Sequence, residues 1–329
     1  MGRTIALLGL LALGGLLLSG CGESSPTILK PGGSAAEDIK QLAVEIFAIL
    51  SVVLLTVWAL LAIVIIRGRR RPEAMASQTE GNWVIEVIWT LIPAVIIVIL
   101  FALTIRTTRE LTLPEHGADF AAIGHQWWWE FDFEREGFKT ANEVHVPVGR
   151  PVSIDIASSD VIHSFWVPQM GGKVDMIPGR INHQRFLPVK EGTYLGECAE
   201  FCGAQHGKMR FLFVVESPAE FSAWVADQRR PAAEPTTPAA IAGAEVAATV
   251  GCSGCHTIRG TSLGGTVGPD LTHFGSRSGI AAFTLPNTPA NLKEWLTDPQ
   301  AVKPESHMPR IPLPGAQIDE LVAYLEGLK

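Results

Sequence analysis

Two long apolar runs on either side of a basic stretch restrict this chain more than any other feature. They span 44–66 and 87–105, each close to the length of about 20 residues that a helix needs to cross a bilayer. Arginines crowd the stretch after the first run, Arg67-Gly68-Arg69-Arg70-Arg71. Because short basic loops stay on the cytoplasmic side, the runs predict a transmembrane hairpin with both ends outside. Everything after Arg106 should then lie on the outer side of the membrane.

The N-terminus predicts an export signal. Arg3 precedes an apolar run that ends at Leu18, as in a secretory signal peptide. The following Leu18-Ser19-Gly20-Cys21 resembles a bacterial lipobox, which implies a signal over 1–20 and lipid on Cys21. A plain signal peptide with an incidental cysteine is the alternative.

Composition supports a membrane protein and argues against one class of partner. Of 329 residues, 47% are hydrophobic, which is too apolar for a wholly soluble chain. The formal net charge is −7. A chain that binds nucleic acid needs a basic face, so we expect no nucleic acid partner.

The part between the hairpin and a proline-rich segment is expected to be an all-β sandwich or barrel. Short β-rich runs are separated by turn signals such as Pro147-Val148-Gly149-Arg150. A short helix over 218–228 should close the domain. The predicted strands are 127–133, 143–148, 152–157, 184–187 and 211–216.

The C-terminal part is predicted to be a separate, helical domain. Prolines at 231, 235 and 238 interrupt a segment without apolar periodicity, which predicts an extended tether. Helices are expected over 241–250, 289–296 and 315–328. So small a core would be stabilised by a bound cofactor.

We therefore expect eight segments along the chain. They are a signal peptide (1–20), an outer segment (21–43), a first transmembrane helix (44–66), a cytoplasmic loop (67–86), a second transmembrane helix (87–105), a β domain (106–228), a linker (229–240) and a helical domain (241–329).

The segment Cys252-Ser253-Gly254-Cys255-His256 predicts covalent attachment of a c-type haem. In C-x-x-C-H, two thiols add to the haem vinyl groups and the histidine is presented to the iron. A redox dithiol or half of a zinc site fits less well, because no cysteine follows Cys255 to supply a second ligand pair. Met308 is the predicted sixth ligand, with His307 and His273 as rivals. Methionine and histidine ligation suits electron transfer.

A second cluster, CAEFCGAQHGKM (198–209), predicts a copper site. A disulfide between Cys198 and Cys202 would leave His206 and Met209 unexplained. Thiolate, thioether and imidazole groups together favour copper over zinc. Two thiolates four residues apart indicate two copper ions that share bridging sulfurs. Each ion then needs its own histidine, and spacing leaves five upstream candidates open: His116, His125, His145, His163 and His183.

Several stretches together resemble the fused subunit II of bacterial cytochrome c oxidases. They are VIEVIWTLIP (84–93), GHQWWW (124–129), ASSDVIHSFWVP (157–168), GKVDMIPGR (172–180) and the cluster at 198–209. The C-terminal part resembles class I cytochromes c in its C-x-x-C-H motif and in GPDL (268–271). The resemblance implies a membrane-anchored multidomain protein. Its parts would be a two-helix transmembrane hairpin, an all-β cupredoxin-like domain and an all-α class I cytochrome c domain.

The resemblance also implies a ligand set for the dinuclear copper (CuA) centre. Cys198 and Cys202 would be bridging thiolates, with His163 and His206 as terminal ligands. The Met209 sulfur and the backbone carbonyl of Glu200 would be weak axial ligands.

Three further roles are implied by the resemblance. Trp127 would be the aromatic residue through which electrons reach the copper. The Glu200 side chain would face a magnesium or manganese ion shared with subunit I. Glu86 resembles the carboxylate at the mouth of a proton channel.

The implied function is electron input to a respiratory oxidase in the bacterial plasma membrane. Haem c would pass electrons to CuA and then to subunit I, where oxygen reduction is coupled to proton pumping. Partners would be subunit I, subunit III, membrane lipid, and a donor such as a cytochrome c or a quinol-cytochrome c reductase. The alternatives are a copper-delivery lipoprotein, a copper-free quinol oxidase subunit, and the CuA-bearing subunit of a nitrogen-oxide reductase.

Overall fold

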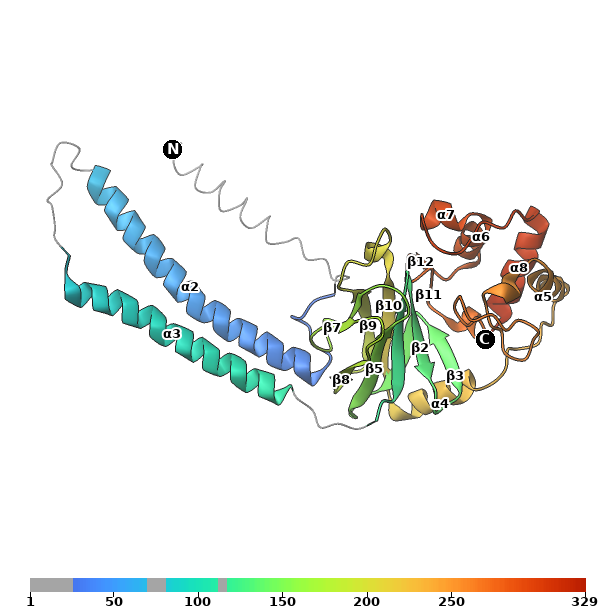
Figure 1. Cartoon of the computed structure of the whole chain (residues 1–329), viewed down its shortest axis with the longest axis horizontal. Coiled ribbons are helices and arrows are strands. Elements are labelled where there is room, and N and C mark those ends of the chain that lie inside the picture. The colour runs from blue at the N-terminus through green and yellow to red at the C-terminus, as the bar shows by residue number, and fades with distance from the viewer. Residues whose placement is uncertain (1–25, 70–80, 112–116) are drawn as a thin grey trace, which may run out of the picture.

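The chain is arranged in three consecutive parts. The computed structural model describes residues 26–69, 81–111 and 117–329 (Figure 1). A helical hairpin projects from a β-sheet domain, and a helical C-terminal domain lies on the opposite side of that domain. The predicted signal peptide, Cys21, the end of the basic loop and His116 lie outside the described residues.

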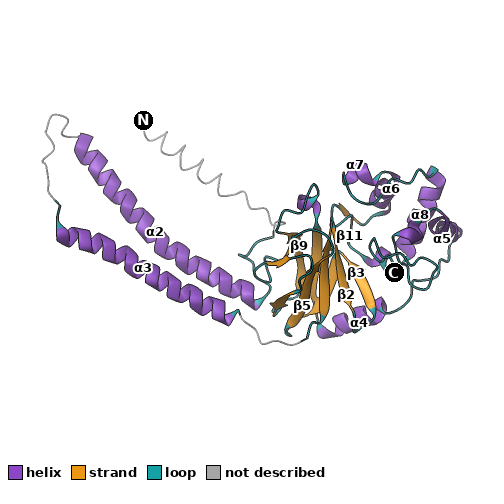
Figure 2. Cartoon of the chain, viewed as in Figure 1, coloured by secondary structure: helices purple, strands orange, loops and turns teal. Residues whose placement is uncertain are grey.

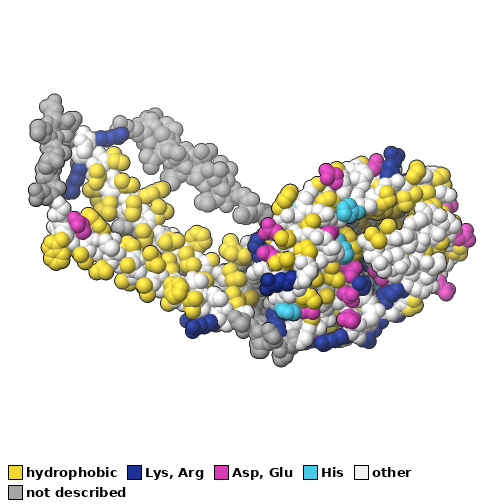
Figure 3. Space-filling view, in the orientation of Figure 1, with side chains coloured by type: hydrophobic (Ala, Val, Ile, Leu, Met, Phe, Trp, Pro, Cys, Tyr) yellow, Lys and Arg dark blue, Asp and Glu magenta, His cyan; other side chains and the backbone are white. Residues whose placement is uncertain are grey.

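The hairpin consists of α2 (Ser34–Arg69) and α3 (Trp83–Glu110). Both helices are long and apolar enough to cross a membrane, and no residue in the most apolar window of either helix is buried. Hydrophobic side chains cover the visible face of both helices (Figure 3). The helix α2 begins well before the apolar run at Val44. This outer extension joins the membrane part directly to the β-sheet domain.

The polypeptide just before α2 is fixed to the β-sheet domain by backbone hydrogen bonds. The Gly32 and Gly33 amides donate to the Gln169 carbonyl at 2.8 and 3.0 Å. The Ser34 amide donates to the Leu187 carbonyl at 3.0 Å. The hairpin is therefore attached at the start of α2 through several ordered contacts.

The β-domain, residues 117–228, is a sandwich of two five-stranded sheets (Figure 2). One sheet has the order β3-β2-β1-β5-β8 and the other β4-β10-β9-β6-β7. The strands are β1 (Phe120–His125), β2 (Trp128–Phe133), β3 (Phe138–Ala141), β4 (Glu143–Pro147), β5 (Val152–Ser158), β6 (His163–Trp166), β7 (Val174–Met176), β8 (Asn182–Phe186), β9 (Gly192–Cys198) and β10 (Arg210–Glu216). Helix α4 (Pro218–Gln228) follows, started by a capping box from Ser217 and Glu220.

Aromatic side chains from both sheets fill the space between them. Phe131 and Trp129 come from one sheet, and Phe165 and Phe211 come from the other. All four are fully buried, and the Phe165 and Phe211 rings stack with centroids 4.8 Å apart. Burial of this kind is the main favourable term in folding. Cys198, Cys202 and Met209, from the predicted copper-binding cluster, belong to this core.

The strand prediction was correct for five strands, with ends displaced by one or two residues, and it missed five others. The missed strands are β1, β3, β6, β7 and β9. Strand β9 contains Gly192 and Gly196, residues that are depleted in strands. Strands β6 and β7 have four and three residues, too few to show an alternating pattern.

The C-terminal domain, residues 238–329, contains four α-helices in the described chain. They are α5 (Pro238–Thr249), α6 (Pro289–Thr297), α7 (Pro299–Val302) and α8 (Gly315–Gly327). Short 3-10 turns, η2 (Cys252–Gly254) and η3 (Phe274–Ser276), and a small β11 (Gly279–Ile280) and β12 (Leu285–Pro286) pair connect them. Its small apolar core includes Val246, Leu292, Leu321 and Tyr324.

The segment between the two domains is irregular, as expected for a tether, but it is not detached. The Ala232 amide donates to the Arg259 carbonyl at 2.9 Å, and the Arg259 side chain donates to the Gln228 carbonyl at 2.5 Å. His273 lies 3.1 Å from the Arg230 carbonyl. The C-terminal domain is thus docked on the β-domain rather than held at a distance.

Candidate copper and haem sites

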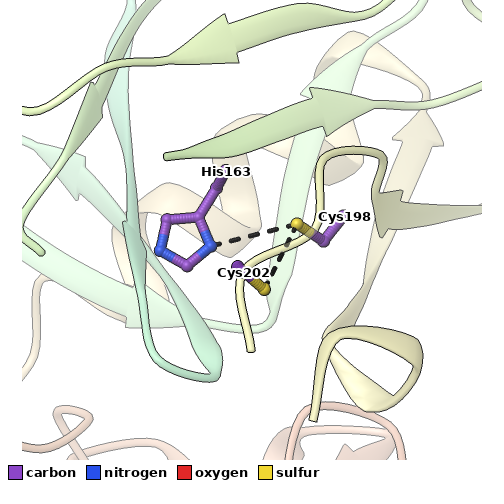
Figure 4. A group of neighbouring side chains, drawn as sticks. All are labelled: His163, Cys198 and Cys202. Carbon is purple, nitrogen blue, oxygen red and sulfur yellow. Dashed lines mark hydrogen bonds between the residues drawn. The ribbon is translucent and has the colours of Figure 1, made fainter. Parts of the chain in front are cut away.

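Five sulfur and imidazole groups meet in one largely buried cluster of the β-domain. The Cys198 and Cys202 Sγ atoms are 3.7 Å apart, and His163 Nδ1 lies 3.9 Å from the Cys198 sulfur (Figure 4). The Cys202 sulfur lies 3.7 Å from His206 Nδ1 and 3.8 Å from the Met209 sulfur. The ligand atoms of His163 and the two cysteines all lie within 4.8 Å of one another. The arrangement suits metal ions held between the two sulfurs.

The two thiols are free, since their separation far exceeds a covalent S–S bond of about 2.05 Å. Hydrogen bonding from the Cys202 thiol, together with His163, lowers the pKa of the Cys198 thiol to about 3. The Cys198 sulfur in turn raises the pKa of the Cys202 thiol. The pair alone therefore holds one negative charge. A second thiolate needs cationic charge nearby, which copper ions would supply, so this donor set fits the metal.

Three separate segments bring these ligands together. His163 begins β6 and Cys198 ends β9, and the two strands pair with Phe165 opposite Cys198. The remaining ligands lie on the loop between β9 and β10, which contains η1 (His206–Lys208). The Cys198 amide donates to the Met209 carbonyl at 3.1 Å and closes this loop at its base.

The His163 ring is fixed on two sides. Its Nε2 lies 2.8 Å from the Asp160 carboxylate, which leaves Nδ1 facing the sulfurs. A Cβ at Gly124 would lie 2.8 Å from the ring, so only glycine allows this approach of β1. Asp160 also accepts the Gln126 amide at 2.6 Å. An outer carboxylate of this kind sets the orientation and basicity of a ligating histidine.

The other upstream histidine candidates in the described chain lie away from the cysteine pair. His125 stacks on Trp128 with ring centroids 4.1 Å apart. His145 lies between Glu143 and Glu216, at 3.3 and 3.1 Å. His183 is exposed and contacts Asp155 at 2.8 Å. Of the upstream candidates in the described chain, only His163 reaches the cysteine pair.

Trp127 lies directly beside the copper-binding cluster. Its indole Nε1 donates to the Cys202 carbonyl at 3.0 Å, and Gln126 Nε2 donates to the same carbonyl at 2.7 Å. The Trp127 ring centroid is 5.5 Å from that of His307 in the C-terminal domain. The indole therefore bridges the two domains.

A cavity of about 440 Å³ lies where the C-terminal domain meets the β-domain. Cys252, Cys255, His256 and Met308 line it from the C-terminal domain. Residues of the β-domain, among them Trp127, line another part of its wall. The thiol pair, the imidazole and the thioether face one apolar space, so the residues fit a covalently attached haem.

The His256 ring is oriented for ligation through Nε2. Its Nδ1 donates to the Pro269 carbonyl at 2.8 Å, because a carbonyl can only accept. Burial lowers the pKa of His256, so the ring stays neutral. A Cβ at Gly268 would lie 2.7 Å from the ring. As at His163, a glycine and one hydrogen bond fix a histidine.

Met308 and its rival His307 both line the cavity, whereas His273 does not. The Met308 carbonyl accepts from Gln300 Nε2 at 3.0 Å. His273 is buried against Arg230 and Asp227 instead. The structure therefore leaves Met308 and His307 as candidate ligands.

The two predicted carboxylate sites are on the surface of the chain. The Glu200 side chain is exposed, while its backbone carbonyl is 3.2 Å from the Cys198 sulfur. Glu86 lies in the first turn of α3, after the N-cap Asn82. Neither carboxylate has a described partner that defines its role.

Sequence reasoning missed Asp160, and it missed that Lys303 is buried with its Nζ donating to the Trp127 carbonyl at 2.7 Å. Asp160 stands three residues before His163 in the quoted ASSDVIHSFWVP stretch, and that spacing could have suggested it. Lys303 has no local signal, since a lysine between two helices is ordinarily a surface residue.

Comparisons with known proteins agree with this organisation. Residues 27–106 match the cytochrome c oxidase subunit II transmembrane domain, 135–217 its periplasmic domain, and 240–329 cytochrome c. Cytochrome c oxidase subunit 2 of Alkalihalophilus pseudofirmus is 38% identical over 95% of this chain and 94% of its own length. The Bacillus subtilis protein of that name is 31% identical over 97% of this chain and 96% of its own length.

One solved relative covers the β-domain alone. The periplasmic domain of cytochrome oxidase subunit II from Bradyrhizobium japonicum is 31% identical, with a TM-score of 0.35, over 36% of this chain and 97% of that chain. The assignment rests on the full-length relatives. By sequence across nearly its whole length, the chain belongs to the cytochrome c oxidase subunit II family, with a fused cytochrome c domain, and is a subunit of a haem-copper oxidase.

Proposed function

We propose that this chain is the electron-input subunit of a respiratory cytochrome c oxidase. The C-terminal domain accepts one electron from a donor, and the β-domain accepts that electron and delivers it to subunit I. Each transfer oxidises the donor domain and reduces the acceptor by one electron. The single observation that carries the proposal is the convergence of Cys198, Cys202, His163, His206 and Met209 next to a cavity lined by the C-x-x-C-H residues and Met308.

Once bound, a dinuclear copper centre and a haem c would supply reversible one-electron chemistry. Cys198 and Cys202 would hold copper as shared thiolates. His163 and His206 would be its imidazole ligands, and Met209 a weak thioether ligand. The Glu200 carbonyl, 3.2 Å from the Cys198 sulfur, would be the other weak ligand.

In the C-terminal domain, Cys252 and Cys255 would form thioether bonds to the haem, and His256 and Met308 would ligate its iron. Trp127 would serve as the aromatic contact between the domains, because its indole hydrogen-bonds to the Cys202 carbonyl and lies beside His307. The eight segments expected from the sequence, from the signal peptide (1–20) to the helical domain (241–329), belong to the same proposal.

Three residues link the chain to its surroundings in this proposal. The exposed Glu200 carboxylate would face a magnesium or manganese ion shared with subunit I. Glu86, at the start of α3, would stand at the mouth of a proton channel that serves proton pumping. Cys21 would carry lipid. The hairpin would place the chain in the bacterial plasma membrane, with the β-domain outside and with subunits I and III as partners.

Metal analysis and a visible spectrum of the purified oxidase test this function. We expect two coppers in this chain, one covalently bound haem c, and a near-infrared band from the copper pair. Reduced donor should bleach the copper band only when haem c is present. A mature chain in which Cys198 and Cys202 are joined to each other without metal would overturn the proposal.

A further inference from the structure

The face between the β-domain and the C-terminal domain is closed by specific hydrogen bonds. The Ser278 amide donates to the Glu143 carboxylate at 3.0 Å. The Arg210 amide donates to the Ala282 carbonyl at 3.3 Å, and Lys208 Nζ donates to the Val302 carbonyl at 3.0 Å. These bonds join segments far apart in the sequence, so they report one docked arrangement.

A single lysine lies at the centre of this face. Lys303 is only 3% exposed. Its Nζ donates to the carbonyls of Trp127 at 2.7 Å, Lys208 at 2.9 Å and Ala281 at 3.1 Å. An ammonium group has three N–H donors, so its hydrogen-bonding capacity is fully used. Two acceptors belong to the β-domain and one to the C-terminal domain.

Such a lysine is costly to bury, because a charged group loses its hydration in the interior. Burial lowers the pKa of Lys303, while its three carbonyl acceptors favour the charged form with three donors. Its partners are backbone carbonyls, which hold the group through dipoles and hydrogen bonds rather than through an ion pair. An apolar residue would fill the space without this cost, so the three bonds need a reason beyond packing.

The backbone beside Lys303 is also unusual. Ala281, Ala282 and Phe283 all have left-handed conformations, with φ values of 52°, 57° and 55°. Residues with a Cβ adopt this region at a cost and retain it where surrounding contacts require it. Here the turn directs the Ala281 carbonyl to Lys303 and the Ala282 carbonyl to the Arg210 amide. The interface therefore holds a strained turn in place.

Lys303 acts on the residue that bridges the two sites. The carbonyl of Trp127 accepts its shortest hydrogen bond. The Trp127 indole donates to the Cys202 carbonyl on one side and lies beside the His307 ring on the other. His307 adjoins Met308, the proposed haem ligand. By fixing the Trp127 backbone, Lys303 also fixes the contact between the copper loop and the haem cavity.

We propose that Lys303 is a positioning residue that locks the C-terminal domain onto the β-domain, with Trp127 fixed between the copper loop and the haem cavity. Its consequence for electron transfer rests on the function proposed above. Because the domains are locked, each electron passes within one docked arrangement. Transfer then does not wait for the tethered domain to find its partner by diffusion.

Hydrogen exchange in the full chain tests the lock without reference to electron transfer. Lys303→Met keeps the length of the side chain and removes its donors. We expect exchange at the Ser278 and Arg210 amides to become at least about tenfold faster, because three buried carbonyls lose their partner. Lys293→Met is the matched control, since its ion pair with Asp319 stays within the C-terminal domain. Equal exchange in both variants would refute the lock.

Lys303→Gln gives a graded second variant if the methionine protein fails to fold. Glutamine keeps two N–H donors, so its exchange rate should lie between those of the parent protein and of Lys303→Met. If Lys303→Gln has normal haem and copper spectra and exchanges at the rate of the parent protein, Lys303 does not have the proposed positioning role.

Internal electron transfer in the assembled oxidase separates positioning from general damage. In Lys303→Met, we expect transfer from haem c to copper to slow at least about tenfold and to become sensitive to solvent viscosity, because domain motion now limits it. The haem and copper contents of the variant should equal those of the parent oxidase. Viscosity-independent transfer at the parental rate would contradict the inference.

The two proposals fail in different ways. If the chain bound neither copper nor haem, the proposed function would be lost, and the exchange experiment would still report docking. If exchange and internal transfer were unaffected by Lys303→Met in a fully loaded oxidase, the proposed function would stand and the positioning role would be lost.

Discussion

The copper-binding cluster and the haem cavity contrast in how the chain builds them. The cluster includes residues of the two-sheet core, and its ligand atoms already lie within 4 Å of a neighbouring ligand. The haem cavity is an open volume of about 440 Å³ between two domains, with its ligands near residues 252–256 and 308. The cluster is formed within one domain, whereas the cavity is lined by residues of both domains.

This difference follows from strand pairing. In the cluster, β6 and β9 are hydrogen-bonded neighbours, so His163 and Cys198 are brought together by the sheet. The candidate haem ligands lie in and just after η2 and on an irregular segment after α7, and no strand pairing in the described chain joins those segments. We therefore expect loss of a copper ligand to change the stability of the β-domain little, whereas loss of haem should lower the stability of the C-terminal domain.

The largest expected effect is removal of a bridging thiolate. Cys198→Ser should lower copper binding and oxidase turnover by more than about 100-fold, since even residues outside the ligand set change metal affinity by 10–100-fold. Haem c should remain. Metal content and visible spectra of the purified oxidase measure both.

Met308→Ala is the matched control for that variant. It should keep two coppers while the haem potential falls, because methionine ligation raises that potential. A copper-replete Cys198→Ser protein would show that the cluster does not depend on two thiolates.

The next largest effect is expected at the haem cavity. Cys252→Ala/Cys255→Ala should prevent haem attachment and leave the cavity unfilled. We expect the melting temperature of the C-terminal domain to fall by on the order of 10–20 °C, because a bound cofactor stabilises only the folded state. The β-domain transition should move far less. Calorimetry of the full chain separates the two, and parallel losses in both domains would contradict the expected independence.

A matched glycine pair sharpens the comparison. A Cβ at Gly124 would lie 2.8 Å from the His163 ring, and one at Gly268 would lie 2.7 Å from the His256 ring. Gly124→Ala should destabilise the β-domain by about 1–3 kcal/mol, the usual cost of overpacking. Gly268→Ala should cost less in the haem-free chain, where the His256 ring can turn into the cavity. Denaturant unfolding of each domain measures the difference, and equal costs would indicate equally rigid sites.

The smallest effect concerns pH and the interface side of the β-domain. Although burial opposes it, the Glu143 and Glu216 carboxylates raise the pKa of His145 above 6.5. The stability from this charged ring is therefore complete below pH 6.5 and is lost as pH rises through the raised pKa. His145→Gln should reduce the change in unfolding free energy across that pH range by up to about 1 kcal/mol. An unchanged pH dependence of the unfolding free energy would mean that His145 does not titrate in this pH range.

Local chemistry in the sequence was sufficient for much of this protein. The apolar runs predict both hairpin helices, and C-x-x-C-H places three haem-site residues within five positions. The group at 198–209 indicates soft-metal chemistry because its ligands are close in sequence. In each case the prediction depends on the hydrophobicity or the ligand groups of residues close together in the sequence, which folding does not change.

Long-range choices were not accessible in the same way. Spacing left five histidines open as the fourth strong copper ligand, and only the resemblance favoured His163. In the described chain, strand pairing brings His163 to the cysteines, while His125 and His145 are engaged by Trp128 and by two glutamates. Such partners depend on the whole fold, and no local pattern contains them.

By itself, the sequence determined the membrane hairpin and the order of the parts, and it predicted two metal-binding chemistries, because these depend on hydrophobicity and on candidate ligands close together in the chain. Only the tertiary structure decided that the segment after Gln228 docks instead of trailing free, and that Lys303 is buried between the domains. The physical reason is that docking and burial depend on contacts between residues up to 176 positions apart, where a carbonyl and an ammonium meet only after both domains have folded.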